Sequence, residues 1–299
     1  MSKRPILVTG SHRSGSTWIG RILESSGKLR YVHEPFNIEN KRGFSPFNYW
    51  FEHISEKTKI QHQSAAEAYL RSFFSRSPKS FFSNLKKVRT SRGFYFFLKD
   101  FQNRMTKRTV LKDPIALLSA EWIHKKTHCD VVVSIRHPAA FVASLKIKEW
   151  AFDFNHFLQQ EELMHSHLKP FGDEIKHFAT YPPSIIEQGI LLWNILYTVA
   201  LNYKEKYGET WFFVRHEDLS DDPITAFEKM FDYLEVPFSA SVKNKILNTT
   251  TNNVATEHQR NAKENKFSWK KRLTVSEIAL IKEKTSPLWK KYYSESDWN

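Results

Sequence analysis

"PILVTGSHRSGSTW", residues 5–18, places a glycine-rich turn directly after a short apolar strand and directly before an expected helix. Gly10 and Gly15 are followed by Ser16 and Thr17, which matches the frame G-x-x-x-x-G-K-[ST] of a phosphate-binding P-loop except that Ser16 replaces the lysine. Backbone N–H groups of such a turn surround an anion, and the dipole of the following helix attracts it. The stretch therefore predicts a phosphate-binding loop at the end of a strand.

The rest of the chain alternates between strand and helix patterns. Strands are predicted at residues 5–10, 31–35, 109–114, 130–138 and 209–219, and helices at 15–26, 115–126, 138–148, 184–206 and 223–234. Val131, Val132 and Val133 form an apolar run without alternation, which is typical of a strand covered on both sides. We therefore predict an α/β fold, with a P-loop-type parallel sheet flanked by helices on both faces.

Two long segments interrupt this alternation, at about residues 44–104 and 150–183. Both are too long to be simple crossover loops, so we interpret them as helical insertions near the active-site edge of one domain spanning residues 1–299. The first is rich in Phe, Lys and Arg, which leaves contact with a membrane surface or RNA open. An amphipathic helix that buries its Phe face is the more ordinary interpretation.

Composition limits the kind of protein and partner. The chain has 299 residues, 40% of them hydrophobic, and 45 basic against 32 acidic residues give a net charge of +13. This balance favours an anionic partner, whether nucleic acid, a membrane surface or a polyanionic small substrate. Cys129 is the only cysteine, which excludes an intrachain disulfide. With no leader-like N-terminus and no apolar run judged long enough to span a bilayer, we expect a soluble cytoplasmic protein.

A second motif, "SIRHPAAFVASL" at residues 134–145, follows the fourth predicted strand. Arg136 precedes Ser144 by eight residues, and Pro138 stands early in the following helix, where proline is favoured. A guanidinium fork suits a phosphomonoester dianion, and a serine hydroxyl adds a further hydrogen bond. The motif therefore predicts a second phosphate site.

Together these motifs resemble those of the sulfotransferases, whose donor is 3′-phosphoadenosine 5′-phosphosulfate. "RSGSTW" resembles their 5′-phosphosulfate loop, and "SIRHPAAFVASL" resembles their 3′-phosphate site. The order of "HEPF", "LKDP" and "VRHEDLSDDP" is most similar to the carbohydrate sulfotransferases. The likeness covers residues 5 to about 235 outside the insertions, and it departs from those enzymes in lacking a membrane anchor and in a loosely similar C-terminal region.

The resemblance implies which residues bind the donor. They are Arg13, Ser14, Gly15, Ser16, Thr17, Trp18, Arg136, Ser144 and Arg260, with Lys263 and Lys266 as further candidates in the C-terminal region. It also implies transfer of a sulfuryl group to a hydroxyl of a sugar or glycolipid. We expect no metal ion, because the donor brings its own good leaving group, and no nucleic acid as a partner.

In-line sulfuryl transfer needs a general base and positive charge at the leaving phosphate. For the leaving phosphate we choose Arg13, and for the base Glu34, with His33 and His12 as rivals. The alternative for Glu34 is a structural ion pair with a basic neighbour. Strand alternation should point His33 and Glu34 to opposite faces, and we expect the first two strands to flank one crevice. Lys112 is assigned to the sulfonate. Asp113 is expected to orient Lys112 or to serve the acceptor.

Two other functions stay open at this point. A P-loop kinase with a degenerate loop would use ATP and Mg²⁺. Asp100 and Asp113 each follow an apolar stretch, which is the position expected for the Asp that binds Mg²⁺ in such a kinase. A basic nucleic-acid-binding protein is the other alternative, although the basic residues are scattered and no recognition motif is present.

Overall fold

A five-stranded parallel sheet forms the centre of the computed structural model, which describes residues 4–40, 45–74, 90–251 and 266–299. The strand order is β2-β3-β1-β4-β5. The strands are β1 (Ile6–Gly10), β2 (Leu29–His33), β3 (Arg108–Lys112), β4 (Asp130–Ile135) and β5 (Phe212–Arg215). All pairings are parallel, so the carboxyl ends of all five strands meet at one edge, and the predicted α/β fold is confirmed.

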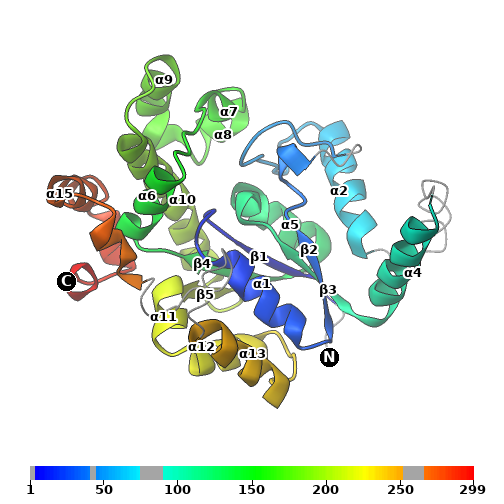
Figure 1. Ribbon diagram of the computed structural model, residues 1–299. Coiled ribbons are helices and arrows are strands. Elements are labelled where there is room, and N and C mark those ends of the chain that lie inside the picture. The colour runs from blue at the N-terminus through cyan, green and yellow to red at the C-terminus, as the bar shows by residue number, and fades with distance from the viewer. Residues whose placement is uncertain (1–3, 41–44, 75–89, 252–265) are drawn as a thin grey trace.

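Alternating side chains of the strands enter two separate cores. Ile6 and Val8 of β1 pack with Val132 of β4 under the helices α1 (Ser16–Ser25), α12 (Pro223–Tyr233) and α13 (Ala240–Thr251). Figure 1 shows these three helices together on one face of the sheet. Leu7 and Val131 point to the opposite face, which explains why the apolar run in β4 does not alternate.

The opposite face is covered by α5 (Ala120–Thr127), α6 (Pro138–Ile147) and α10 (Ile185–Tyr207). Ser184 and Glu187 form a capping box at the start of α10. With 23 residues, α10 is long and apolar enough by composition to cross a membrane, so the expectation that no such run exists was wrong. In the fold, 67% of its apolar window is buried, as in the core helix of a globular domain.

The described residues of both insertions are largely helical, as predicted. The first contains α2 (Ile60–Phe74) and most of α4 (Ser91–Thr106), and η1 (Ile38–Asn40) precedes it. The second contains α7 (Asn155–Leu158), α8 (Glu161–His165), η3 (Lys169–Phe171) and α9 (Gly172–Thr180). Asp100 lies on α4 and pairs with Arg30 and Arg104, at 2.7 Å in each case. It therefore does not end a strand, and its likeness to a P-loop metal ligand was misleading.

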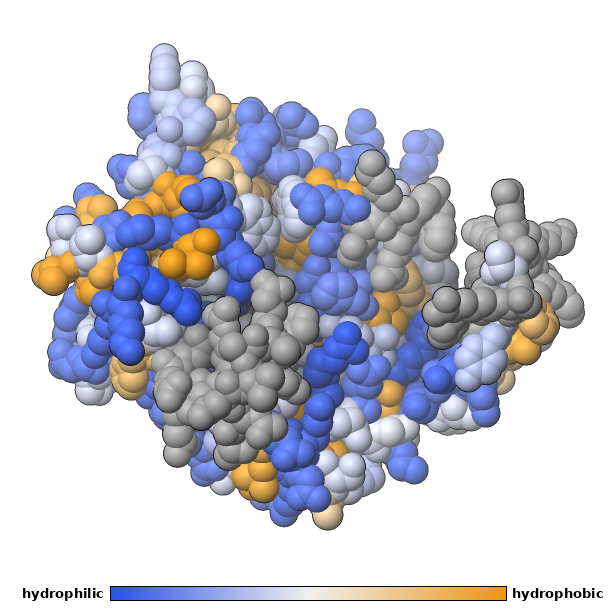
Figure 2. Space-filling view, viewed as in Figure 1, coloured by the Kyte–Doolittle hydropathy of each residue, from blue (hydrophilic) through white to orange (hydrophobic). Residues whose placement is uncertain are grey.

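The remaining elements complete the side of the sheet beyond β5. Besides η2 (Pro114–Ser119) after β3, they are α11 (His216–Asp221), η4 (Ser268–Lys271), α15 (Val275–Lys284), η5 (Leu288–Lys291) and η6 (Glu295–Trp298). The element η4 packs against α6, and α15 packs against α6 and α10. The face in Figure 2 is mostly hydrophilic, with separate apolar areas rather than one continuous patch.

Candidate active site

The turn between β1 and α1 depends on its two glycines. Gly10 has φ = 142°, and a Cβ there would overlap the carbonyl oxygen of Ser134 in β4. Gly15 has φ = 88° and stands immediately before α1, where a Cβ would overlap the imidazole ring of His216. Both positions therefore require glycine for the backbone conformation and for the close approach of a neighbouring element.

Hydrogen-bond donors of this loop remain available to an anion. The backbone N–H groups of Ser16, Thr17 and Trp18 lie in the first turn of α1, where no helix carbonyl can accept from them. Within the described residues the hydroxyls of Ser16 and Thr17 also make no hydrogen bond. Ser14 differs, because its Oγ donates to the carbonyl of Ser11 at 2.6 Å and so shapes the loop itself.

Arg13, Arg136 and Ser144, which come from the two separate motifs, meet beside the loop. Nε of Arg13 donates to Oγ of Ser144 at 2.9 Å, and the guanidinium of Arg136 donates to the carbonyl of Arg13. Arg13 is exposed with φ = 62°, whereas Arg136 is buried and its Nε has no hydrogen-bond partner among the described residues. Burial and the charge of Arg13 lower the pKa of Arg136. An anion would therefore be stabilised here by two guanidinium groups and a hydroxyl.

Two residues of α10 support this cluster from behind. The Tyr197 hydroxyl lies 2.7 Å from Oγ of Ser11 and accepts from the N–H of Arg136 at 2.8 Å. Nε1 of Trp193 donates to the carbonyl of Arg136 at 2.9 Å. Neither residue was predicted from the sequence, because aromatic side chains within an apolar helix carry no motif.

His216, the first residue of α11, was also missed. Its ring lies behind Gly15, its centroid is 6.0 Å from that of Trp18, and neither ring nitrogen has a partner among the described residues. Burial, followed by the charge of Arg136, lowers the pKa of His216 to about 3, so the ring is neutral. Leaving a buried polar group unpaired costs about 1–3 kcal/mol, so the His216 ring is a candidate contact for a ligand bound at Gly15. The feature of the sequence that could have identified His216 was its position at the carboxyl end of the fifth strand, because ligands of α/β sheets bind at the carboxyl ends of the strands.

Glu34 and Lys112 form an ion pair at the same edge of the sheet. Lys112 is the last residue of β3 and is fully buried, and its Nζ lies 2.5 Å from Oε1 of Glu34. Oε2 of Glu34 accepts from the amide of Asn37 at 3.0 Å. Burial alone would raise the pKa of Glu34, but the charge and hydrogen bond of Lys112 outweigh it and hold that pKa below its ordinary value. Glu34 is thus a carboxylate at neutral pH.

The surroundings of Glu34 differ from the predicted ones in two ways. In the sheet β3 lies between β1 and β2, so the first two strands do not flank one crevice and Lys112 stands between them. Strand alternation also does not separate His33 from Glu34, because β2 ends at His33 and Glu34 has φ = 41°. Nε2 of His33 lies 3.7 Å from Oε2 of Glu34, while its Nδ1 lies 3.0 Å from the Tyr31 hydroxyl.

His12 and Asp113 are both buried beside this edge. Burial, followed by the charge of Arg13, lowers the pKa of His12 to about 3, and its Nδ1 has no partner among the described residues. The Asp113 carboxylate accepts the N–H groups of Phe36 at 2.6 Å and Ile115 at 3.2 Å, and burial raises its pKa to about 7. In this arrangement Asp113 holds the turn that follows β3.

The C-terminal region approaches the Arg136 motif from the other side. The ring of Trp269 stacks on His137, with centroids 5.3 Å apart and planes 15° apart. Lys266 pairs with Asp221 at 2.6 Å. Arg260 and Lys263 lie outside the described residues.

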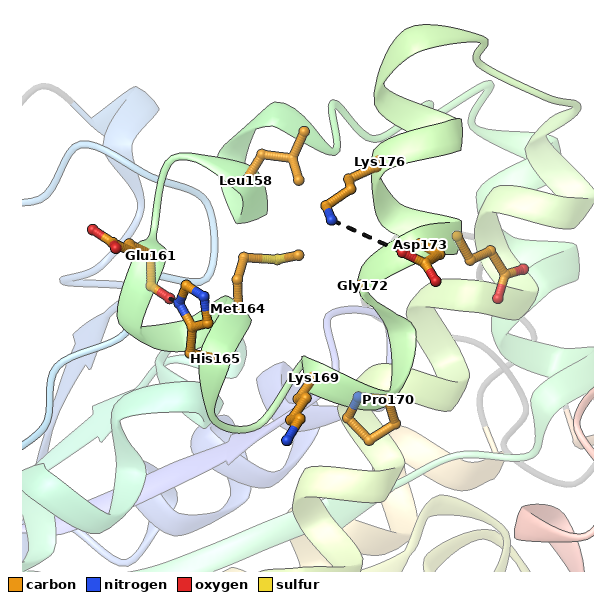
Figure 3. Close-up of a pocket in the computed structure, with 10 residues that line it drawn as sticks. Leu158, Glu161, Met164, His165, Lys169, Pro170, Gly172, Asp173 and Lys176 are labelled. Atoms are coloured by element: carbon orange, nitrogen blue, oxygen red, sulfur yellow. Dashed lines mark hydrogen bonds and ion pairs between the residues drawn. The ribbon is translucent and has the colours of Figure 1, made fainter.

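Two cavities among the described residues lie away from these side chains. Figure 3 shows the larger, of about 580 Å³, between α7, α8 and α9, with Met164 and Leu158 inside it and the Lys176–Asp173 pair at its rim. A smaller one of about 180 Å³ is lined by His53, Trp122 and Tyr203 among others. No candidate residue lines either cavity. Within the described part of the chain, no three His, Cys, Asp or Glu residues gather closely enough to hold a metal ion.

Comparisons with known proteins identify the family. The family model described as "Sulfotransferase family" matches residues 5–240, which is most of the chain. The "Sulfotransferase Domain from the Curacin Biosynthetic Pathway" has a similar structure, with a TM-score of 0.50 at 16% identity over 96% of this chain and 99% of that one.

Two further solved structures align with lower scores. The sulfotransferase STF9 from Mycobacterium avium gives a TM-score of 0.47 at 14% identity, covering 98% of this chain and 78% of that one. Mouse sulfotransferase SULT7A1 complexed with PAP gives a TM-score of 0.46 at 13% identity, covering 98% of this chain and 86% of that one. No curated protein sequence matches closely enough to count as a relative. On the extent of the family match, this chain belongs to the sulfotransferase family.

Proposed function

We propose that this sulfotransferase moves a sulfuryl group from 3′-phosphoadenosine 5′-phosphosulfate to a hydroxyl of a sugar or glycolipid. The observation that carries the choice of donor is the contact of Arg13 with both Arg136 and Ser144. It brings a second anion-binding group next to a P-loop that has Ser16 in place of the lysine. A donor with phosphates on both its 3′ and 5′ positions matches such a pair of sites.

The residues fit the two ends of this donor in different ways. The backbone N–H groups and hydroxyls of Ser16 and Thr17 suit the 5′-phosphosulfate, supported by the N-terminal dipole of α1. The buried Arg136, with its unpartnered Nε, suits the 3′-phosphate together with Ser144. Arg13 adjoins both groups, so its exposed side chain is able to neutralise charge on either phosphate.

Glu34 and Lys112 suit the transfer step. The acceptor oxygen forms a bond to sulfur while the bond between sulfur and the 5′-phosphate oxygen breaks, and the acceptor proton passes to the carboxylate of Glu34. Negative charge then grows on the departing 3′-phosphoadenosine 5′-phosphate, near Arg13 and the loop N–H groups. The lowered pKa of Glu34 keeps it deprotonated, and Lys112, which is held beside Glu34, would contact the sulfonate.

Two finer points remain proposals that rest on the sequence. A sugar or glycolipid acceptor is supported by the order of the Glu34, Asp113 and Arg136 motifs. A cytoplasmic location is supported by Cys129, the single cysteine, whose thiol is buried with its pKa raised to about 12.

Thermal unfolding with nucleotides tests the donor assignment. At one hundred times its Kd, 3′-phosphoadenosine 5′-phosphate should stabilise the protein by about 2.7 kcal/mol. Adenosine 5′-phosphate, which lacks the 3′-phosphate, is the matched control and should act only at much higher concentration. Stabilisation by ATP with Mg²⁺, and none by the bisphosphate, would instead support the kinase.

A further inference from the structure

The two insertions meet next to the phosphate loop through aromatic side chains. The His12 ring centroid lies 4.4 Å from that of Trp150 in the second insertion and 5.6 Å from that of Phe51 in the first. The Trp50 and Trp150 centroids are 5.8 Å apart, with ring planes at 74°. In Figure 1 the chain before α2 and the α7–α8 region face each other above the sheet edge. Residues far apart in sequence thus form one aromatic surface beside the loop.

Polar bonds along this junction hold the insertions together. The backbone N–H of His53 donates to Oε1 of Gln160 at 2.7 Å, and Oγ of Ser55 donates to Glu162 at 2.6 Å. The junction is therefore a fixed part of the fold and does not depend on aromatic contacts alone. Removing one exposed aromatic ring should leave it assembled.

Two backbone features direct the tryptophans toward the loop. Phe51 has φ = 57°, which is unusual for a bulky residue, and its side chain is buried. At the other side, α6 ends at Ile147. Two residues later Glu149 is in the left-handed region, and the N–H of Trp150 donates to the carbonyl of Leu145 at 3.1 Å. Strained conformations persist where a site needs them, and Arg13 and Glu34 of the same edge are also left-handed.

Trp50 and Trp150 keep part of their surface exposed, unlike Phe51 and Phe141 beneath them. Neutral polar groups stand beside the pair: the half-buried His156 has a pKa lowered by burial, and Tyr49 lies 6.3 Å from it between ring centroids. Glu34 is close enough to His12 for its charge to act on the His12 pKa. Half-exposed indole rings and uncharged hydrogen-bonding groups thus lie on the side of the loop that faces the base.

We propose that Trp50 and Trp150 determine acceptor specificity by packing against a sugar ring whose hydroxyl is directed to Glu34. This inference rests on the proposed function and names the residues that select its acceptor. A pyranose has an apolar C–H face for an indole ring and equatorial hydroxyls for His156 and Tyr49, which matches this mixed surface. Nδ1 of His156 already accepts the N–H of Trp50 at 3.4 Å, and a fully apolar acceptor would offer no partner to its Nε2 or to the Tyr49 hydroxyl.

The test uses single variants of the full chain with 3′-phosphoadenosine 5′-phosphosulfate as donor. The probes are octyl β-D-glucoside, octyl β-D-galactoside and octyl N-acetyl-β-D-glucosaminide, with 2-naphthol as a flat acceptor without a sugar. Trp150→Ala and Trp50→Ala should each raise KM for the used glycoside at least tenfold, while kcat falls less. Trp150→Phe should recover part of the loss. Tyr181→Ala, which removes an aromatic ring that is 68% exposed in the same insertion, should change neither value.

The affinity for 3′-phosphoadenosine 5′-phosphate, measured on the same samples, separates the possible failures. It should stay within twofold of wild type in both tryptophan variants. Unchanged KM values in both variants would overturn this inference. So would a wild-type enzyme that sulfates 2-naphthol but none of the glycosides. A wild-type enzyme that binds the bisphosphate but sulfates neither the glycosides nor 2-naphthol would overturn it as well. Absence of bisphosphate binding by the wild type would instead refute the proposed function.

Discussion

Replacing Glu34 by glutamine should remove the base while keeping a side chain of the same shape. The oxygen and nitrogen of the new amide would still occupy the positions next to Asn37 and Lys112, but an amide cannot take up the acceptor proton. General-base catalysis contributes about 10²–10⁴ in rate, and kcat should fall by that factor. Affinity for 3′-phosphoadenosine 5′-phosphate should remain nearly normal, because Lys112, which contacts the Glu34 side chain, is assigned to the sulfonate that this bisphosphate lacks.

The same change should also destabilise the fold, and the structure gives the size. Lys112 is buried and its ammonium is held by Glu34, so Glu34→Gln leaves a buried charge without its counter-ion. Breaking a buried pair in this way costs about 3–5 kcal/mol, whereas replacing both partners by uncharged groups is often neutral. The double variant Glu34→Gln/Lys112→Met should therefore recover most of the stability and none of the rate.

The assay measures kcat, bisphosphate affinity and thermal unfolding on the same sample of each variant, with His33→Ala beside them. Because the folded pKa of Glu34 is lowered, the stability from its ion pair is fully present above the unfolded value of about 4.3. It is lost as pH falls through the lower folded pKa, and Glu34→Gln should remove this acid dependence. If Glu34→Gln lowers only the unfolding temperature, or if His33→Ala loses the rate instead, the reasoning fails.

Three further predictions concern the donor site. Arg136→Ala should weaken binding of 3′-phosphoadenosine 5′-phosphate by about 1.5–3 kcal/mol. Binding of adenosine 5′-phosphosulfate, which lacks the 3′-phosphate, should barely change. Calorimetry on both ligands decides this, and equal losses would make Arg136 structural. Activity should survive excess EDTA, since the resemblance implies no metal and Ser16 replaces the P-loop lysine; loss on chelation with rescue by Mg²⁺ would contradict it. Gly15→Ala should abolish bisphosphate binding in equilibrium titration, because its Cβ would overlap the His216 ring at a positive φ; normal binding would show that the loop can shift.

The sequence was sufficient for the parts of the site that lie within one short segment. The loop after β1 and the Arg136–Ser144 motif after β4 combine residue type, spacing and position at a strand end, and all three are readable along the chain. Asp100 shows the limit of this approach, because an apolar run ending in Asp is compatible with a strand or with the helix that forms.

Contacts between distant segments account for what was not predicted. His216 faces Gly15 from another strand end, and the side chain of Arg13 lies on Ser144, 131 positions away. Only the order of strands in the sheet brings such residues together. The placement of β3 between β1 and β2, which sets Lys112 beside Glu34, likewise has no local pattern.

Tyr197 joins the two segments proposed to bind phosphate through a single oxygen, which contacts Ser11 of one and accepts the N–H of Arg136 of the other. Because this phenol projects from a long buried helix, the separation between the two segments is set before any nucleotide arrives. A ligand whose two phosphates were spaced differently, such as a 2′-phosphate isomer or a dinucleotide, would have to break these hydrogen bonds to occupy both positions. With the proposed donor site, the interior of the protein would thereby discriminate nucleotides by the spacing of their phosphates, at a residue that none of them would touch.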